Sequence, residues 1–255
     1  MRVERRGSVA IITMNSPKSL NSLTPDMCAV LCGAVASCEC DEAVRAVVVT
    51  GTGRAFCAGG DLHTIASLHD DREAAKGYVR CVGKVASAIA HSAKPYIAAV
   101  NGVAAGAGFN LAIVCDFVYA ASSAAFTQAF SRIGLVSDCC GHFLLPRAVG
   151  PRVAKSLMLL PEKLTAADAL RLGLVGAVVD DDELERKVME VAEKLAKQPP
   201  LAVKYSKKLL NNLSEFDEIM RQEEEIQAEL ITSEDCREGI KAFFEKREPM
   251  FGGRS

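Results

Sequence analysis

Residues 100–110, V-N-G-V-A-A-G-A-G-F-N, decide how this chain is expected to fold. An apolar, strand-like run at 96–100 leads into the stretch, and a helix-like run at 111–114 follows it. Three glycines within seven residues let the backbone turn sharply and leave its N–H groups uncovered by side chains. The stretch therefore predicts a strand, a tight turn and a helix, with backbone groups available to hold a ligand.

A second glycine-rich turn, G-T-G-R-A-F-C-A-G-G-D-L, occupies residues 51–62 after a nearly all-apolar strand at 43–50. A dinucleotide-binding loop is disfavoured, because Phe56 stands where the third glycine of that motif belongs. Asp61 is instead expected to cap a short helix. The N–H of Gly60 would then lie at the positive end of that helix, where a developing negative charge is stabilised.

A third segment, residues 126–141, carries Asp138, the only acidic residue between Asp116 and Glu162. Because a helix-like run follows at 142–149, spacing alone favours Asp138 as a helix N-cap, with a catalytic carboxylate as the alternative. Two backbone N–H groups on one oxygen could stabilise a thioester enolate. A single carboxylate beside the adjacent carbon could then remove a proton and return it elsewhere.

The rest of the chain predicts an α/β protein. A strand is expected at 7–14, a helix capped by Thr24 and Pro25, a helix at 72–90 and a strand at 116–120. Helical patterns dominate from Pro151 onward, and Pro199-Pro200 restarts the chain before further charged helices. We expect a core with the ligand site in residues 1–198 and a helical region at 199–255 that caps the core or docks on another subunit.

Composition excludes several classes of protein. The formal net charge is −2 and the basic residues are scattered, which disfavours binding to nucleic acid or to an anionic membrane. Ten cysteines contain no Cys-x-x-Cys pair, so reduced core thiols in an intracellular protein are expected, and the four histidines lack zinc-ligand spacing. Residues 96–121 have few charges but are broken by glycine, asparagine and aspartate, which predicts a buried crossover rather than a membrane helix.

Several separated motifs resemble the crotonase superfamily, also called the enoyl-CoA hydratase/isomerase family. They are A-F-C-A-G-G-D-L within 51–62, residues 98–110, L-A-I-V-C-D-F-V-Y-A at 111–120, and R-E-G-I-K-A-F-F-E-K-R near the C-terminus. The resemblance covers essentially the whole chain. It implies a spiral of repeated ββα units, a C-terminal helical region that forms trimers or dimers of trimers, and an acyl-CoA ligand.

The resemblance also assigns roles to individual residues. The oxyanion would be held by the backbone N–H groups of Gly60 and Ala107. Other positions would contact the acyl-CoA substrate, the last of them from a neighbouring subunit: Lys18, Leu20, Ala58, Leu62, Asn110, Phe130 and Lys246. Hydratases of the family carry glutamates where this chain has Asn110 and Phe130. Efficient hydration by their mechanism is therefore not expected, because each acid/base step contributes about 10²- to 10⁴-fold.

Asp138 falls where the isomerase branch carries its single catalytic acid, and its surroundings resemble ring-epoxide phenylacetyl-CoA isomerases of phenylacetate degradation. Cys139-Cys140 departs from that branch, in which small serine or glycine residues are usual. We expect an acyl-CoA isomerase that needs no metal or redox cofactor, in the cytoplasm or an organellar matrix, as a homotrimer or homohexamer. A hydratase or hydrolase that uses Asp138 differently, and a non-catalytic CoA-binding or scaffold protein, remain open alternatives.

Overall fold

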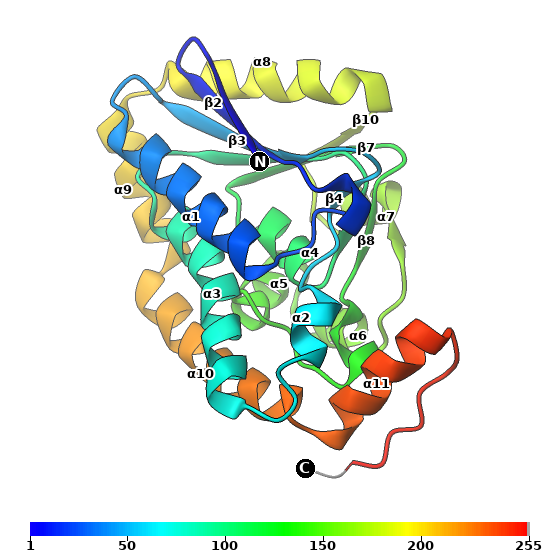
Figure 1. Ribbon diagram of the computed structural model, residues 1–255. Coiled ribbons are helices and arrows are strands. Elements are labelled where there is room, and N and C mark those ends of the chain that lie inside the picture. The colour runs from blue at the N-terminus through cyan, green and yellow to red at the C-terminus, as the bar shows by residue number, and fades with distance from the viewer. Residues whose placement is uncertain (254–255) are drawn as a thin grey trace.

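The computed structural model describes residues 1–253 and consists of two β-sheets wrapped by helices (Figure 1). The larger sheet has the strand order β1-β2-β3-β5-β7-β10 and the smaller one β4-β6-β8-β9. The larger sheet contains β1 (Arg2–Arg6), β2 (Val9–Met14), β3 (Ala46–Gly51), β5 (Tyr96–Val100), β7 (Phe117–Ala121) and β10 (Ala177–Val179). The smaller sheet contains β4 (Ala55–Cys57), β6 (Val103–Ala105), β8 (Ala125–Thr127) and β9 (Leu164–Thr165).

The chain winds as a spiral of ββα turns. In each turn a strand of the larger sheet is followed by a short strand of the smaller sheet and then by helix, as in β3-β4, β5-β6 and β7-β8. Successive turns stack in parallel, so that β3, β5 and β7 pair in order in one sheet while β4, β6 and β8 pair in order in the other. The loops that follow β4, β6 and β8 therefore leave the smaller sheet side by side.

The helices cover both faces of the larger sheet. Figure 1 shows α8 lying over one face, with the smaller sheet and the remaining helices on the other side. The α-helices are α1 (Pro25–Cys40), α2 (Leu62–Ala66), α3 (Arg72–His91), α4 (Ala107–Ile113), α5 (Gly141–Val149), α6 (Pro151–Leu159), α7 (Ala166–Arg171), α8 (Leu184–Ala196), α9 (Pro200–Asn211), α10 (Leu213–Ile231) and α11 (Glu234–Glu245). Short 3₁₀ turns lie at Pro17–Ser19, Ala129–Ile133 and Asp181–Glu183.

Local sequence explains where the main helices begin. Thr24 caps α1, its hydroxyl accepting a hydrogen bond from the N–H of Met27 at 3.1 Å, and Pro25 occupies the first helical position. Asp71 caps α3 in the same way, with the N–H of Ala74 as donor at 2.9 Å. One face of α3 is buried, and its partners include α1 and α10. The Asp71 cap fixes the start of α3, which forms one wall of the site described below.

The α/β class, the spiral and the helical C-terminal region were predicted correctly. Residues 96–121 form β5, β6, α4 and β7, which confirms the buried crossover. None of the helices in residues 1–253 combines the length and the apolar character that crossing a bilayer requires. The strand β1 was missed, because its five residues are all exposed and four are charged. It forms only by antiparallel pairing with β2. The division of the chain at residue 198 stays a prediction.

Candidate active site

The two glycine-rich turns lie against each other because the strands that precede them, β4 and β6, pair in parallel. At their contact, a Cβ added to Gly59 would lie 2.6 Å from the carbonyl oxygen of Ala105 and 3.2 Å from the amide nitrogen of Ala107. The φ angle of Gly59 is also +92°, which L residues rarely adopt. Glycine is therefore required here, and it brings Gly60 next to the start of α4.

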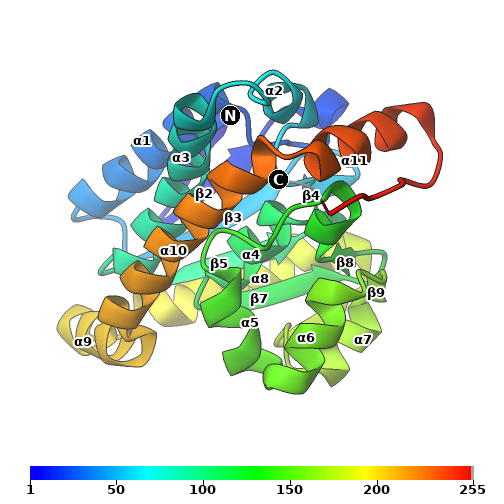
Figure 2. The same cartoon turned by 90° about the horizontal axis from the view of Figure 1, so that it is seen from below.

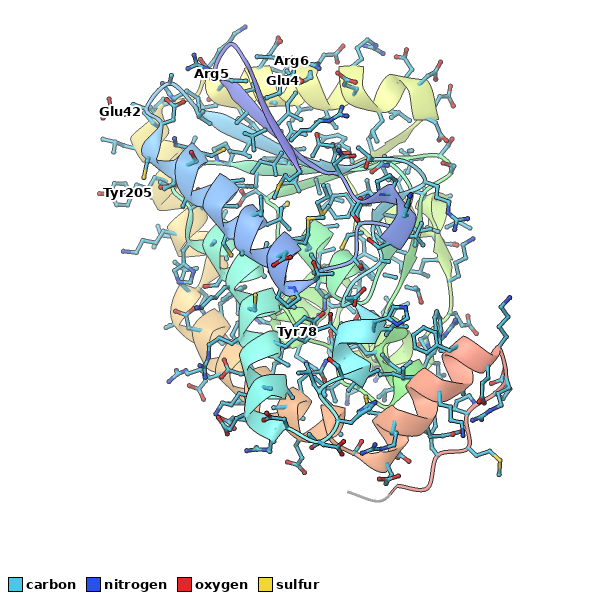
Figure 3. All side chains as sticks on the ribbon, viewed as in Figure 1. Glu4, Arg5, Arg6, Glu42, Tyr78 and Tyr205 are labelled. Carbon is cyan, nitrogen blue, oxygen red and sulfur yellow. The ribbon has the colours of Figure 1, made fainter. Side chains whose placement is uncertain are left out.

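The N–H groups of Gly60 and Ala107 have no acceptor within residues 1–253. Ala107 begins α4, so its N–H is one of those that a helix leaves unpaired. The neighbouring Asp61 N–H is engaged by Tyr78 Oη at 2.9 Å, and this hydroxyl donates to the carbonyl oxygen of Leu23 at 2.7 Å. Tyr78 is labelled in Figure 3, where it extends from α3 near α2. The two free N–H groups remain available to a ligand oxygen.

Asp61 caps α2, as its position in the sequence predicted. Its carboxylate accepts hydrogen bonds from the N–H and the hydroxyl of Thr64, both at 2.9 Å, and from Ser22 Oγ at 3.1 Å. Partial burial raises its pKa, but these hydrogen bonds outweigh that effect and leave the pKa lowered. The Asp61 carboxylate thus serves the turn rather than proton transfer.

Asp138 has the opposite environment. Its side chain is buried, and within residues 1–253 its Oδ1 atom has no hydrogen-bond partner. The pKa of this carboxyl is raised from 3.8 to about 7, first by burial and next by the negative charge of Glu223, while Cys139, Gln227 and His142 act in the opposite direction. The N-cap role that spacing favoured was wrong, because the cap position of α5 is Cys140, and the side chain of that residue makes no capping hydrogen bond. Asp138 is thus a buried carboxyl poised near neutral pH, the property of a general acid or base.

Asn110 is fully buried and holds the backbone of the Asp138 turn. Its Nδ2 donates to the carbonyl oxygen of Asp138 at 2.7 Å and to Ser137 Oγ at 2.9 Å. Its Oδ1 accepts from Gln128 Nε2 at 2.7 Å, and Ser137 Oγ donates to Gln128 Oε1 at 3.1 Å. The amide is committed on both sides to contacts within the protein. A contact between Asn110 and substrate stays a prediction.

Glu223 is a site residue that the sequence analysis missed. It lies on α10, which passes beneath the core between α3 and α5 in Figure 2. Its buried carboxylate accepts hydrogen bonds from the N–H of Cys140 at 2.7 Å, and from the N–H and Nδ1 of His142 at 3.1 and 2.8 Å. A signal was present, because Glu223 and Gln227 fall at helical spacing between the buried Phe216 and Ile231. Buried polar residues on an apolar helix face imply specific partners.

Cys139 and Cys140 both adopt left-handed backbone conformations, with φ of 51° and 62°. For L residues such conformations cost roughly 1–2 kcal/mol each. Glycine, which has no Cβ, adopts such conformations without this cost. Both thiols are buried, and burial raises their pKa values, which disfavours a thiolate nucleophile. All ten cysteines are free, as expected for reduced thiols.

A cavity of about 220 Å³ adjoins Asp138 between α3 and α10. Its walls combine apolar and charged side chains from the two helices with the Asp138 turn. The lining residues are Val79, Arg80, Gly83, Lys84, Ser87, Asp138, Cys139, Asp217, Met220, Arg221, Glu223 and Glu224. The buried carboxyl thus borders a space large enough for a small organic group.

The residues that the resemblance assigns to CoA binding lie at three places in the fold. The loop with Lys18 and Leu20 lies beside the turn at Ala58, whose N–H donates to the Leu20 carbonyl oxygen at 3.0 Å. Leu62 begins α2 immediately after that turn. Phe130 is buried and its ring faces Gly106, 3.6 Å from where a Cβ would stand. Lys246 is exposed at the end of α11. Contacts of any of them with a ligand stay predictions.

Known proteins of similar sequence and structure were compared with this chain. A family model described as "Enoyl-CoA hydratase/isomerase" matches residues 4–254. A protein of Escherichia coli (strain K12) named 1,2-epoxyphenylacetyl-CoA isomerase is 38% identical over 96% of this chain and 95% of its own length. A probable enoyl-CoA hydratase of Rhodobacter capsulatus is 40% identical over 100% and 98%. The crystal structure of an enoyl-CoA hydratase from Mycobacterium avium subsp. paratuberculosis K-10 superposes with a TM-score of 0.89 at 35% identity, covering 98% of each chain.

Proposed function

Because the chain belongs to the enoyl-CoA hydratase/isomerase family, we propose that it is an acyl-CoA isomerase acting through Asp138. It converts 3-enoyl-CoA to 2-enoyl-CoA, or isomerises a ring-epoxide acyl-CoA. The observation that carries the proposal is the buried Asp138 carboxyl with an unpartnered oxygen and a pKa of about 7. A group that titrates near the working pH can both take up and release a proton.

In this proposal the thioester oxygen binds between the N–H groups of Gly60 and Ala107. Support comes from the packing of the two turns and from the absence of acceptors for these N–H groups within residues 1–253. Hydrogen bonds to that oxygen stabilise the enolate more than the neutral thioester, and one such donor contributes about 3 kcal/mol of barrier reduction. The carbon next to the thioester thereby becomes acidic enough for a carboxylate base.

The isomerisation is a proton transfer between two carbons. The Asp138 carboxylate removes a proton from C2, and the electron pair moves into the thioester to form a dienolate. Asp138 then returns the proton to C4, so the double bond moves from C3–C4 to C2–C3 and no atom is gained or lost. Each step moves one proton between the substrate and Asp138 without oxidation or reduction, and the two N–H groups stabilise the dienolate oxygen, so the proposed reaction uses no metal or redox cofactor.

The side chains around Asp138 support isomerisation over hydration. Addition of water requires a second group to activate it, but Asn110 and Phe130 occupy the positions of the expected hydratase acids. The Asn110 amide makes three hydrogen bonds inside the protein, and Phe130 is apolar. Glu223 is also an acid near Asp138, but both of its oxygens accept hydrogen bonds from the Cys140–His142 segment.

Asp138→Asn tests the proposal. We expect conversion of 3-enoyl-CoA to 2-enoyl-CoA to fall by at least about 10²-fold, because a general acid/base is lost, while thioester binding measured by calorimetry is retained. Exchange of the C2 proton with deuterium in solvent should fall in parallel. Unchanged turnover in the variant would exclude Asp138 as the proton carrier.

A hydratase function has one supporting observation, since some relatives of similar identity carry that name, including the Rhodobacter capsulatus protein. A panel of 2-enoyl-CoA esters of several chain lengths distinguishes the two reactions. Mass spectrometry would show a product heavier by one water for hydration and free CoA for hydrolysis. Isomerisation leaves the mass unchanged and is detected instead by the ultraviolet absorbance of the conjugated 2-enoyl thioester formed from 3-enoyl-CoA. Binding without any product would support the non-catalytic alternative.

A further inference from the structure

Two features of the Asp138 turn favour an anionic partner from elsewhere in the chain. Cys139 and Cys140 follow Asp138 in left-handed conformations, and their successive N–H groups lie just before α5. The left-handed Cys140 followed by the helical Gly141 presents successive backbone N–H groups as a small anion-binding concavity. The N-terminus of α5 adds a partial positive charge there.

This partner comes from a helix far along the chain. One Glu223 oxygen accepts from Cys140 N–H at 2.7 Å, and the other accepts from His142 N–H at 3.1 Å and His142 Nδ1 at 2.8 Å. The carboxylate therefore bridges both sides of Gly141, whose own N–H donates to the Asp138 carbonyl oxygen at 2.9 Å. Within this turn, Asn110 holds the carbonyl of Asp138 and Glu223 holds the N–H groups that follow it.

We propose that Glu223 is a positioning residue for the acyl-CoA reaction, holding the Asp138 turn through Cys140 and His142 so that the Asp138 carboxyl faces the substrate. This inference rests on the proposed function of Asp138. Glu223 acts through the turn and does not touch the reacting atoms. Misplacement of a reacting group by about 1 Å can cost about 10²-fold in rate, so loss of this clamp should reduce kcat more than it changes KM.

Glu223 also acts on Asp138 through its charge. A fixed negative charge beside a buried carboxyl disfavours a second negative charge, which raises the pKa of Asp138. Other titratable groups also face Asp138 or line the adjoining cavity: Cys57 from β4; Tyr78, Arg80 and Lys84 from α3; Cys139 and His142 from its own segment; Asp217, Arg221 and Glu224 from α10. Unlike the groups just named, Glu223 combines a negative charge with hydrogen bonds from the backbone N–H groups of the turn.

The variants Glu223→Gln and Glu223→Asp separate the effect of side-chain length from the effect of charge. The glutamine keeps the length of the side chain but replaces one acceptor with a donor, so kcat should fall roughly ten- to hundredfold with KM little changed. The acid limb of the pH–kcat/KM profile should move down by about one unit because the negative charge is gone. The aspartate keeps the charge but shortens the reach, so kcat should fall while the pH profile stays in place.

Glu225→Gln is the matched control, because it makes the same change of charge two residues away on the exposed side of α10. It should leave kcat and the pH profile unchanged. If Glu223→Gln and Glu223→Asp lower only the melting temperature, and the folded enzyme keeps wild-type kcat and pH profile, the proposal is overturned. Should neither variant fold, His142→Leu removes one donor to Glu223 from a half-exposed position, and wild-type kcat in that variant would also overturn it.

A readout without substrate separates this proposal from the proposed function. ¹³C NMR of aspartate carboxyl groups, with the Asp138 signal assigned by its loss in Asp138→Asn, gives the Asp138 titration directly. A downward shift in Glu223→Gln but not in Glu225→Gln would support the coupling even if the wild-type protein isomerised none of the esters tested. An unshifted titration would contradict it even in an active isomerase.

Discussion

The Glu223 carboxylate on α10 accepts a hydrogen bond from the backbone N–H of Cys140 at 2.7 Å, two residues after the buried Asp138. The C-terminal helical region thus takes part in the candidate site as well as covering the core. Asn110, which precedes the turn in the sequence whereas Glu223 follows it, donates a hydrogen bond to the Asp138 carbonyl oxygen. The position of the Asp138 carboxyl therefore depends on two residues that lie 28 and 85 positions away in the sequence.

Asp138→Asn should change how stability depends on pH. The pKa of Asp138 is raised from 3.8 to about 7, so between these values the folded state binds a proton that the unfolded state has released. The stability of the wild-type protein should therefore fall as pH rises from 4 to 7, and the full cost should persist above pH 7. Because asparagine does not ionise, the variant should be more stable than wild type by a few kcal/mol at pH 8 and by little near pH 4. Urea unfolding at both pH values measures this difference, and an equal difference at both would contradict it.

Gly59→Ala should impair the pair of turns that carries Gly60 and Ala107. The added Cβ would meet the Ala105 carbonyl oxygen at 2.6 Å, and φ of +92° would also strain the alanine. We expect a loss of about 1–3 kcal/mol in stability and a larger loss of kcat than of substrate affinity. Gly77→Ala is the control, because Gly77 is exposed in α3 and a Cβ there meets nothing within 4 Å. It should gain about 0.5–1 kcal/mol. Equal effects of the two substitutions would exclude a special role for Gly59.

Asn110→Ala should destabilise the protein and reduce turnover together. The substitution removes one buried partner each from Gln128, Ser137 and the Asp138 carbonyl oxygen. Gln128 Nε2 is left unsatisfied at a cost of about 1–3 kcal/mol, while Ser137 and the carbonyl oxygen each keep one other hydrogen bond. Chemical denaturation and kcat at a temperature at which the variant is folded measure the two effects. Gln222→Ala on the exposed face of α10 should change neither. If kcat stayed at the wild-type value, Asn110 would be a core residue without influence on Asp138.

Tyr78→Phe should loosen the turn that presents Gly60. The hydroxyl links the Asp61 N–H to the Leu23 carbonyl oxygen, and both lose a partner in the variant. We expect a loss of about 1–3 kcal/mol in unfolding free energy and a lower kcat, with the acid limb of the pH profile still near pH 7. A shifted pH profile would instead indicate that Tyr78 acts on Asp138 directly.

Introducing an acid at the expected hydratase position should not create a hydratase. Asn110→Glu would bury a longer, ionisable side chain among Gln128, Ser137 and the Asp138 carbonyl oxygen, where it cannot reproduce the donated hydrogen bonds. We expect lower stability and no hydrated product by mass spectrometry. Hydration at a rate near that of the wild-type isomerisation would show that one side chain separates the two activities.

The sequence by itself determined the class of fold and the turns, and it predicted which residues form much of the candidate site. Glycine spacing indicated the turns at Gly60 and Ala107, and helix-capping patterns indicated Thr24 and Asp61, because these features depend on residues close in sequence. The family resemblance likewise predicted that Asn110 and Phe130 occupy the positions at which hydratases carry acids. The catalytic role of Asp138 was predicted from its position in the family resemblance and stays a prediction, and its environment was not predicted.

Only the tertiary structure decided what surrounds Asp138. Burial and the charge of Glu223 set its proton affinity, and both require α10 to pack under a turn formed about 80 residues earlier. The same packing showed that Asn110 supports the turn and that Asp138 does not cap α5. Long-range packing of this kind leaves no local pattern beyond a buried glutamate on an apolar helix face. Its partner became identifiable only when α10, α5 and the Asp138 turn were brought together in space.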